Sequence, residues 1–302
     1  MSLLYDPRDT LWSHITAGPQ QNTKRMITEF DMQVTMIPQE NRFEYQSPAD
    51  LIGRIRTTID SGSAEEYFLY FHGVTHDNLP EIDGEFFASQ LNCTLRFTTE
   101  NCLRGLICRI LPGWKHKMLT LNLGLEIKDR IRDMPGHSGY SIRTFYGTRF
   151  DLTDIRSKEG DQALGPATRG AKNVWPSVVI QVGYSEALDF LRLDAEWWFH
   201  HSNGAIRFVV LIQLMTGPLA IRIECWAMAP PGHLTAERTP IQFPRCLQEF
   251  EINADGWVKS ASHELCIPYS AIFDEPNKNS RDVVFTNEEL SSFALRMFRQ
   301  MK

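Results

Sequence analysis

The sequence predicts an α/β or α+β protein with a mixed sheet at its centre and helices around it. Short and nearly all-apolar runs at 178–182 and 206–214 are typical of strands that are covered on both faces. Between them, Leu188, Leu191 and Trp198 recur at the spacing of one helix face. The chain of 302 residues is 42 % hydrophobic and 23 % charged, which is the composition of a globular protein with a full core.

The clearest early element is a helix that begins at Ser47 and runs through Ile59. Ser47 is a good N-cap, Pro48 suits the first helical position, and Asp50 places a carboxylate in the first turn. This helix is expected to end near Ser61-Gly62.

Further elements follow from shorter patterns. Residues 66–71 and 95–97 predict strands, separated by a turn at 77–80. Residues 118–134 show both the alternation of a strand and the spacing of a helix, and their charges and length favour a helix. The chain is then expected to run extended over 140–150 and to enter a polar loop.

The last third continues with the same alternation of elements. A helix is expected to begin at Ser185-Glu186, with Ser185 as its N-cap, and to stop at Asn203-Gly204; a third buried strand is expected over 220–228. Thr286 and Glu289 form a capping box in front of a closing helix, whose apolar face carries Leu290 and Phe298.

Composition also limits location and partners. Met1–Trp12 is too charged for a secretory signal, and the longest uninterrupted apolar run, 208–212, is far short of the roughly 20 residues that a membrane span needs. The sequence therefore predicts an intracellular protein, in cytoplasm or nucleus, without a membrane partner. The six cysteines show no metal or disulfide spacing and are expected to be reduced core thiols.

Charge is distributed unevenly along the chain. The net charge is −6, yet residues 104–172 hold 13 Lys+Arg against 7 Asp+Glu, a net of +6. Such a segment either binds a polyanion, DNA or RNA here, or is an ordinary solvated surface. We expect an N-terminal α+β extension over 1–110 and an α/β core over 111–302; a homo-oligomer is also compatible with the sequence.

Familiar catalytic motifs are missing from the sequence: it has no Gly-rich phosphate loop, no Gly-x-Ser-x-Gly elbow and no His-Glu-x-x-His. His200-His201 are interpreted as structural or surface residues, and Trp197-Trp198 as core residues.

A resemblance adds a functional hypothesis. The resemblance is most specific between residues 156 and 214. The segments that carry it are Arg156–Asp161 with Leu164 and Pro166, Trp175–Glu186, Leu191-Arg192 to Trp198, and Arg207–Leu214. They resemble a group of fungal proteins that is similar in layout to the PD-(D/E)XK restriction-endonuclease-like superfamily, over roughly residues 90–225.

The resemblance implies a nuclease core in which a helix, a hairpin and a strand bring acids together. Asp161 stands at the motif aspartate, Gln181 at the strand acid, Gly183 at the lysine, and Glu126 is the candidate first acid. Asp161, Gln181 and Glu126 would then hold Mg²⁺ or Mn²⁺, since phosphodiester hydrolysis uses hard divalent ions on oxygen ligands.

Two departures weaken that site, because Gln181 lacks a charge and Gly183 lacks a side chain. Arg192 or Arg207 could supply the missing cation, although arginine is a poor general base. The alternatives are that Asp161 caps a turn, that Gln181 is a satisfied core amide and that Arg192 pairs on the surface with Asp189 or Glu196.

Three functions remain open at this point. The first is a divalent-metal-dependent nuclease with a degenerate site, and the second an inactive module of the same fold that binds nucleic acid or a protein. The third is a small-molecule enzyme with a pocket under loops 151–175 and 229–246. The first two require Asp161 and Gln181 to meet, and the first also requires solvent to reach them.

Overall fold

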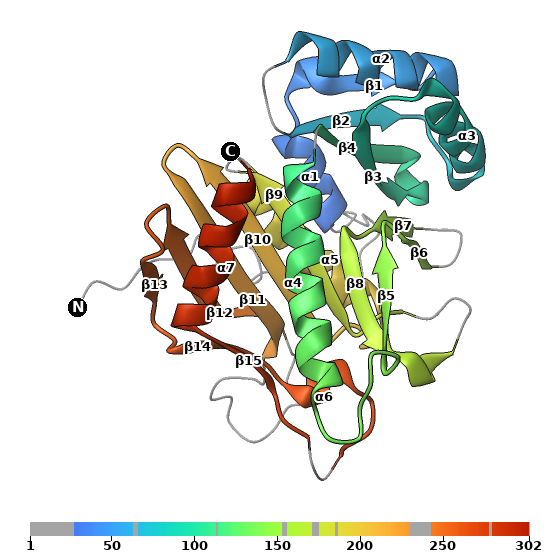
Figure 1. Ribbon diagram of the computed structural model, residues 1–302. Helices are drawn as coiled ribbons and strands as arrows, with labels where there is room; N and C mark the ends of the chain where they lie inside the picture. The colour runs from blue at the N-terminus through green and yellow to red at the C-terminus, as the bar shows by residue number, and fades with distance from the viewer. Residues whose placement is uncertain are drawn as a thin grey trace, which may run out of the picture.

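The computed structural model describes residues 27–62, 66–112, 114–152, 156–170, 175–184, 187–229, 243–277 and 280–301. These residues form two large mixed sheets and a small two-stranded one, with helices packed on them (Figure 1). The α+β class predicted from the sequence is therefore confirmed.

The larger sheet has seven strands in the order β13-β12-β11-β10-β9-β8-β5. Their bounds are β5 Ile142–Tyr146, β8 Gln162–Pro166, β9 Val178–Tyr184, β10 Phe208–Thr216, β11 Leu219–Ala229, β12 Phe243–Asn253 and β13 Val258–Ser260. Only β9 and β10 pair in parallel, and α5 (Leu188–His201) makes the crossover between them. The two apolar runs of the sequence are thus neighbouring central strands.

Helices cover both faces of this sheet. On one face, α4 (Lys115–Arg132) and α7 (Asn287–Gln300) share a core with the side chains of Ile180 and Val210. On the other face, α5 packs Leu191 and Trp198 against Val179. Alternate residues of β9 therefore face different helices, which explains why the whole strand is buried.

The N-terminal sheet has six strands in the order β1-β2-β4-β3-β7-β6. Their bounds are β1 Arg42–Glu44, β2 Tyr67–His72, β3 Cys93–Glu100, β4 Gly105–Pro112, β6 Arg149–Leu152 and β7 Arg156–Glu159. Helices α2 (Pro48–Ser61) and α3 (Leu79–Ser89) pack on it, while α1 (Glu29–Met36) lies against α5. Short elements complete the fold: η2 Gln39–Asn41, η3 His76–Asn78, η4 Asn101–Leu103, η6 Ala167–Arg169, α6 Tyr269–Ile272, and the pair β14 Glu264–Ile267 and β15 Val283–Thr286.

One hairpin connects the two sheets. β6 and β7 lie between β5 and β8 in sequence, but they extend the N-terminal sheet through pairing of β7 with β3. The expected division at 110/111 therefore has residues 149–159 on its C-terminal side, although they complete the N-terminal sheet.

The helices and turns that the sequence predicts are confirmed in part. The helices expected from Ser47 and Thr286 are confirmed, with both residues accepting the capping hydrogen bond, and so is the helix over 118–134. The turn at 77–80 is wrong, because Leu79 begins α3, and the polar loop after 150 is wrong, because β7 and β8 form there.

The cysteines are only partly in the core. All six are free, but Cys102 and Cys246 are exposed, so the expectation of core thiols holds for Cys108 and Cys225. Trp197 and Trp198 are buried as predicted. Within the described ranges, no helix is long and apolar enough to cross a membrane.

Candidate functional site: a buried charge cluster between the two sheets

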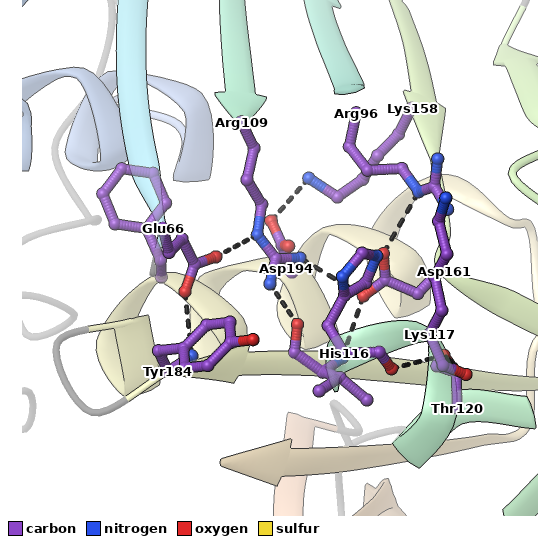
Figure 2. Close-up of polar contacts among 12 residues, drawn as sticks. Glu66, Arg96, Arg109, His116, Lys117, Thr120, Lys158, Asp161, Tyr184 and Asp194 are labelled. Atoms are coloured by element: carbon purple, nitrogen blue, oxygen red, sulfur yellow. Dashed lines mark hydrogen bonds and ion pairs between the residues drawn. The ribbon is translucent and has the colours of Figure 1, made fainter. Parts of the chain in front are cut away.

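Asp161 lies at the connection between β7 and β8, where the chain passes from the N-terminal sheet to the larger one. It is only 4 % exposed. Its Oδ2 accepts from the backbone N of Val182 at 2.9 Å and from Nη1 of Arg109 at 3.3 Å, and its Oδ1 accepts from Nε of Arg96 at 3.1 Å (Figure 2). Both carboxylate oxygens therefore have protein donors.

Arg109 is the central residue of the cluster. It projects from β4 of the N-terminal sheet and is buried. Its guanidinium donates to the carboxylates of Glu66 and Asp161 and to the backbone carbonyl of Val182. Glu66 also accepts from the backbone N of Tyr184 at 2.8 Å. Two carboxylates and one carbonyl thus converge on one guanidinium (Figure 2).

Gln181 does meet Asp161, as the sequence predicted. With its amide oriented to satisfy both neighbours, Gln181 donates from Nε2 to Oδ2 of Asp161 at 3.0 Å and accepts at Oε1 from Nε1 of Trp198 at 3.0 Å. The expectation that solvent reaches this pair is wrong, since Gln181 is only 1 % exposed. Gln181 has the contacts of a satisfied core amide, which was the structural alternative.

The electrostatics of the cluster follow from burial and from the arginines. Burial alone would raise the pKa of Asp161, but the charges of Arg109 and Arg96 outweigh it and hold that pKa below its usual value. Burial is the larger effect at Glu66, whose pKa is raised although Arg109 opposes the shift. The arginines therefore favour the ionised form of Asp161 more strongly than burial opposes it, whereas burial prevails at Glu66.

A second polar group adjoins the first. Lys158 of β7 is buried and lies 2.5 Å from Oδ1 of Asp194 on α5, and it donates to Oγ1 of Thr98 at 2.9 Å. Arg96, Arg109, Lys158 and Asp194 line a cavity of about 10 Å³, close to the volume that one water molecule needs.

His116, in the first turn of α4, borders the cluster, and its imidazole ring makes no hydrogen bond. It is 1 % exposed, and neither ring nitrogen has a partner. Burial lowers the pKa of His116 to about 4, against the opposing charge of Asp161. A neutral imidazole is therefore expected here at neutral pH.

Gly183, where the resemblance implies a lysine, has almost no room for a side chain. An added Cβ would lie 3.0 Å from Cβ of Ala187, 3.1 Å from Cδ1 of Leu191 and 3.3 Å from Nη2 of Arg109. The positive charge nearest this position is thus the guanidinium of Arg109.

The other residues expected at the site lie elsewhere. Glu126 pairs with Arg296 of α7, and it is ten residues along α4 from His116, a rise of about 15 Å. Arg192 pairs with Glu224 at 2.5 Å and with Asp189, the surface partner considered for it. Arg207 pairs with Asp274 at 2.7 Å. The structure brings Asp161 and Gln181 together, but not Glu126, Arg192 or Arg207.

The donor set does not fit a divalent ion as the residues now stand. Carboxylate and carbonyl oxygens are the ligands of Mg²⁺ and Mn²⁺, but those of Asp161, Glu66 and Val182 already hold a guanidinium. Across the described part of the chain, no group of three or more His, Cys, Asp and Glu is arranged to hold a metal ion.

Sequence reasoning missed Arg109, Arg96 and Glu66. A signal was present for Arg109, since it is the one charged residue in the otherwise apolar run 106–111. A buried arginine needs a buried partner, so this residue indicated a polar cluster behind β4. Its partners lie far away in sequence and carried no comparable signal.

The pocket expected under loops 151–175 and 229–246 lies partly outside the described residues, which omit 153–155, 171–174 and 230–242. Comparison with known proteins yields no match: no family model, no curated protein and no solved structure is significantly similar to this chain.

Proposed function

We propose that the chain is a catalytically inactive module of the nuclease type and that it acts by binding a protein partner. The observation that carries the proposal is the place of Arg109. Its guanidinium is bound by Asp161, Glu66 and the carbonyl of Val182, which is the kind of oxygen set that would otherwise bind a divalent cation.

The order of elements supports a relation to the nuclease layout. A helix (α4) is followed by an antiparallel pair (β5 and β8, with β6 and β7 between them in sequence), a strand (β9), a second helix (α5) and a strand parallel to β9 (β10). Asp161 precedes β8 and Gln181 lies in β9, in the arrangement that the resemblance implies.

The residue types at the site favour the inactive form. Gln181 is neutral, and its side-chain amide is hydrogen-bonded to Asp161 and Trp198. Gly183 has no space for a lysine. A protein cation on a fixed side chain balances the carboxylate charge, but unlike a metal ion it generates no hydroxide from bound water.

Charge pairing disfavours nucleic acid as the partner. Among the described residues of 104–172, seven basic side chains form ion pairs with carboxylates, namely Arg109, Arg130, Arg132, Arg149, Arg156, Lys158 and Arg169. Six of those carboxylates come from outside the segment: Glu66, Asp83, Glu100, Asp194, Asp274 and Glu289. The net charge of the segment is therefore largely balanced in the folded chain.

Exposed apolar side chains on α4 favour a protein. Trp114, Leu121 and Leu125 are 48 %, 38 % and 50 % exposed. At helical spacing they share the side of α4 opposite the buried Leu123 and Ile127. Aromatic and aliphatic residues gathered on one surface are typical of protein interfaces.

Catalysis is tested with the purified chain, with single- and double-stranded DNA and RNA as substrates, and with Mg²⁺ or Mn²⁺ added. We expect no cleavage above that of Asp161→Asn. Metal-dependent cleavage that disappears in Asp161→Asn would overturn the proposal.

The partner class is tested separately. Filter binding at about 50 mM salt should retain neither DNA nor RNA, whereas binding that weakens steeply with salt would contradict a protein partner. Cross-linking in cell extract should give a partner protein that is lost from the variant Leu121→Glu/Leu125→Glu but kept by Leu247→Glu, a change at an exposed leucine of β12. Equal capture by both variants would count against the α4 surface.

A further inference from the structure

Helix α1 covers one side of the polar cavity next to the charge cluster. Gln33 of α1 is buried and lines this cavity, and its Nε2 donates to Oδ1 of Asp194 at 2.6 Å and to the carbonyl of Phe190 at 3.4 Å. Phe30 packs beside it in a small apolar cluster with Phe190. The side-chain amide of Gln33 thus lies between solvent and the Asp194–Lys158 pair.

The N-terminal end of α1 is fastened to α5 by one carboxylate and two histidines. Oε1 of Glu29 lies 2.5 Å from Nδ1 of His200, and Oε2 of Glu29 lies 3.6 Å from Nε2 of His201. Glu29 and His201 are largely buried, while about a third of the His200 side chain is exposed. Protons can therefore reach His200 without unfolding of the core.

Other charged groups face this contact from each element packed around it. Glu196, one turn earlier on α5, also favours the charged form of His200. Nη1 of Arg156 from β7 lies 3.3 Å from Nδ1 and 3.4 Å from Nε2 of His201, and Arg156 is itself paired with Glu100 of β3. On α1, Asp31 accepts from Thr28 in the capping box. Glu29 is the group that bonds to both rings.

The two partners titrate in opposite directions from their usual values. The hydrogen bond from Glu29 raises the pKa of His200 above 6.5, more strongly than its burial lowers it. Burial opposes ionisation of Glu29, but the bonds to His200 and His201 together hold the pKa of Glu29 well below 4.5. The attraction is therefore complete near pH 5 to 6 and is lost as the pH rises through the raised pKa of His200.

We propose that α1 is a pH-sensitive strap, which closes over the polar cavity while His200 is protonated and loosens when His200 loses its proton. Loosening withdraws Gln33 from Asp194 and opens Lys158 and the cavity to solvent. The strap is independent of the proposed function, since it requires neither a partner nor catalysis.

The test is hydrogen exchange of the full chain followed by mass spectrometry between pH 5.5 and 9, with rates corrected for the intrinsic effect of pH. The readout is protection of residues 29–36, with the amides of β9 as an internal measure of global stability. The variants are His200→Gln and Glu29→Gln. The control is His72→Gln, which removes a histidine whose ion-pair partner, at 3.1 Å, is Glu44 and not Glu29.

We expect protection of 29–36 in the wild type to fall with rising pH, by up to about tenfold for each unit by which the pKa of His200 is raised. His72→Gln should behave like the wild type. His200→Gln and Glu29→Gln should show low protection that no longer depends on pH, with β9 still protected. A flat wild-type profile, or an unchanged pH dependence in both variants, would overturn the proposal.

Discussion

Replacing Arg109 by methionine tests whether this guanidinium is the counter-ion of the site. Methionine keeps much of the length and apolar volume of the side chain but removes its charge. Arg109, Asp161 and Glu66 are all nearly inaccessible, with side chains 6 %, 1 % and 5 % exposed. Removing one partner of a buried ion pair costs about 3–5 kcal/mol, because the other charge stays buried without compensation.

The assay is urea unfolding at pH 7, with the free energy of unfolding taken by linear extrapolation. Arg132→Met is the matched control, since Arg132 is 51 % exposed and pairs with surface aspartates, where the loss should stay below about 1 kcal/mol. Arg109→Lys keeps the charge and should lose less than Arg109→Met, which guards against a purely steric effect.

Two further readouts connect the stability change to the chemistry. The deficit of Arg109→Met should shrink as the pH falls, because the raised pKa of Glu66 lets this carboxylate take up a proton. Mn²⁺ should stabilise Arg109→Met by about 2.7 kcal/mol at a hundred times its dissociation constant, and should leave the wild type unchanged. If Arg109→Met loses no more stability than Arg132→Met, Arg109 is not the counter-ion of these carboxylates.

Three other outcomes follow from the structure. The folded chain holds the pKa of Asp161 below 3.8, so this residue stabilises the fold above about pH 4 and loses that effect as the pH falls. The urea midpoint should therefore change less between pH 2 and 6 in Asp161→Asn than in the wild type. An equal change in both proteins would contradict this. Gly183→Ala places a Cβ 3.0 Å from that of Ala187 and should lower the free energy of unfolding by about 1–3 kcal/mol. Gly84→Ala in α3 places a Cβ with nothing within 4 Å and should stabilise the folded chain. The reverse order of the two variants in urea unfolding would refute the packing argument. Ser47→Ala removes the hydrogen bond that the backbone N of Asp50 donates to the N-cap side chain, and should lower the free energy of unfolding by about 1 kcal/mol. Thermal melts check this, and an unchanged Tm would show that the cap contributes nothing to stability.

Elements with local signals were predictable from the sequence. The N-caps Ser47 and Thr286 are read from neighbouring residues alone, and both helices begin there. β7 was missed because its buried polar residues are satisfied only by distant partners: Ser157 bonds with Thr99 at 2.8 Å, and Lys158 with Asp194. A polar run reads as a loop when those partners are unknown.

The candidate site was predictable only where its residues are close together in the expected order of elements. Asp161 directly precedes β8 and Gln181 lies in the neighbouring strand β9, so their meeting followed from the expected layout. Glu126 was chosen by its charge and its order in the chain, but the buried face of α4 is set by Leu123 and Ile127, and Glu126 lies on the side next to α7. Arg109 comes from the other sheet, so only the tertiary fold shows its role.

The β6–β7 hairpin has a consequence for any attempt to divide the protein. Cutting the chain between residues 110 and 111 would leave the first fragment with three whole strands and a truncated β4 (Gly105–Pro112), and would strip β3 of its neighbour β7. The second fragment would keep Asp161 and Lys158 but lose Arg109 and Thr98. Each piece would thus carry an open sheet edge or an uncompensated charge, and denaturation of the intact chain should occur as one cooperative transition.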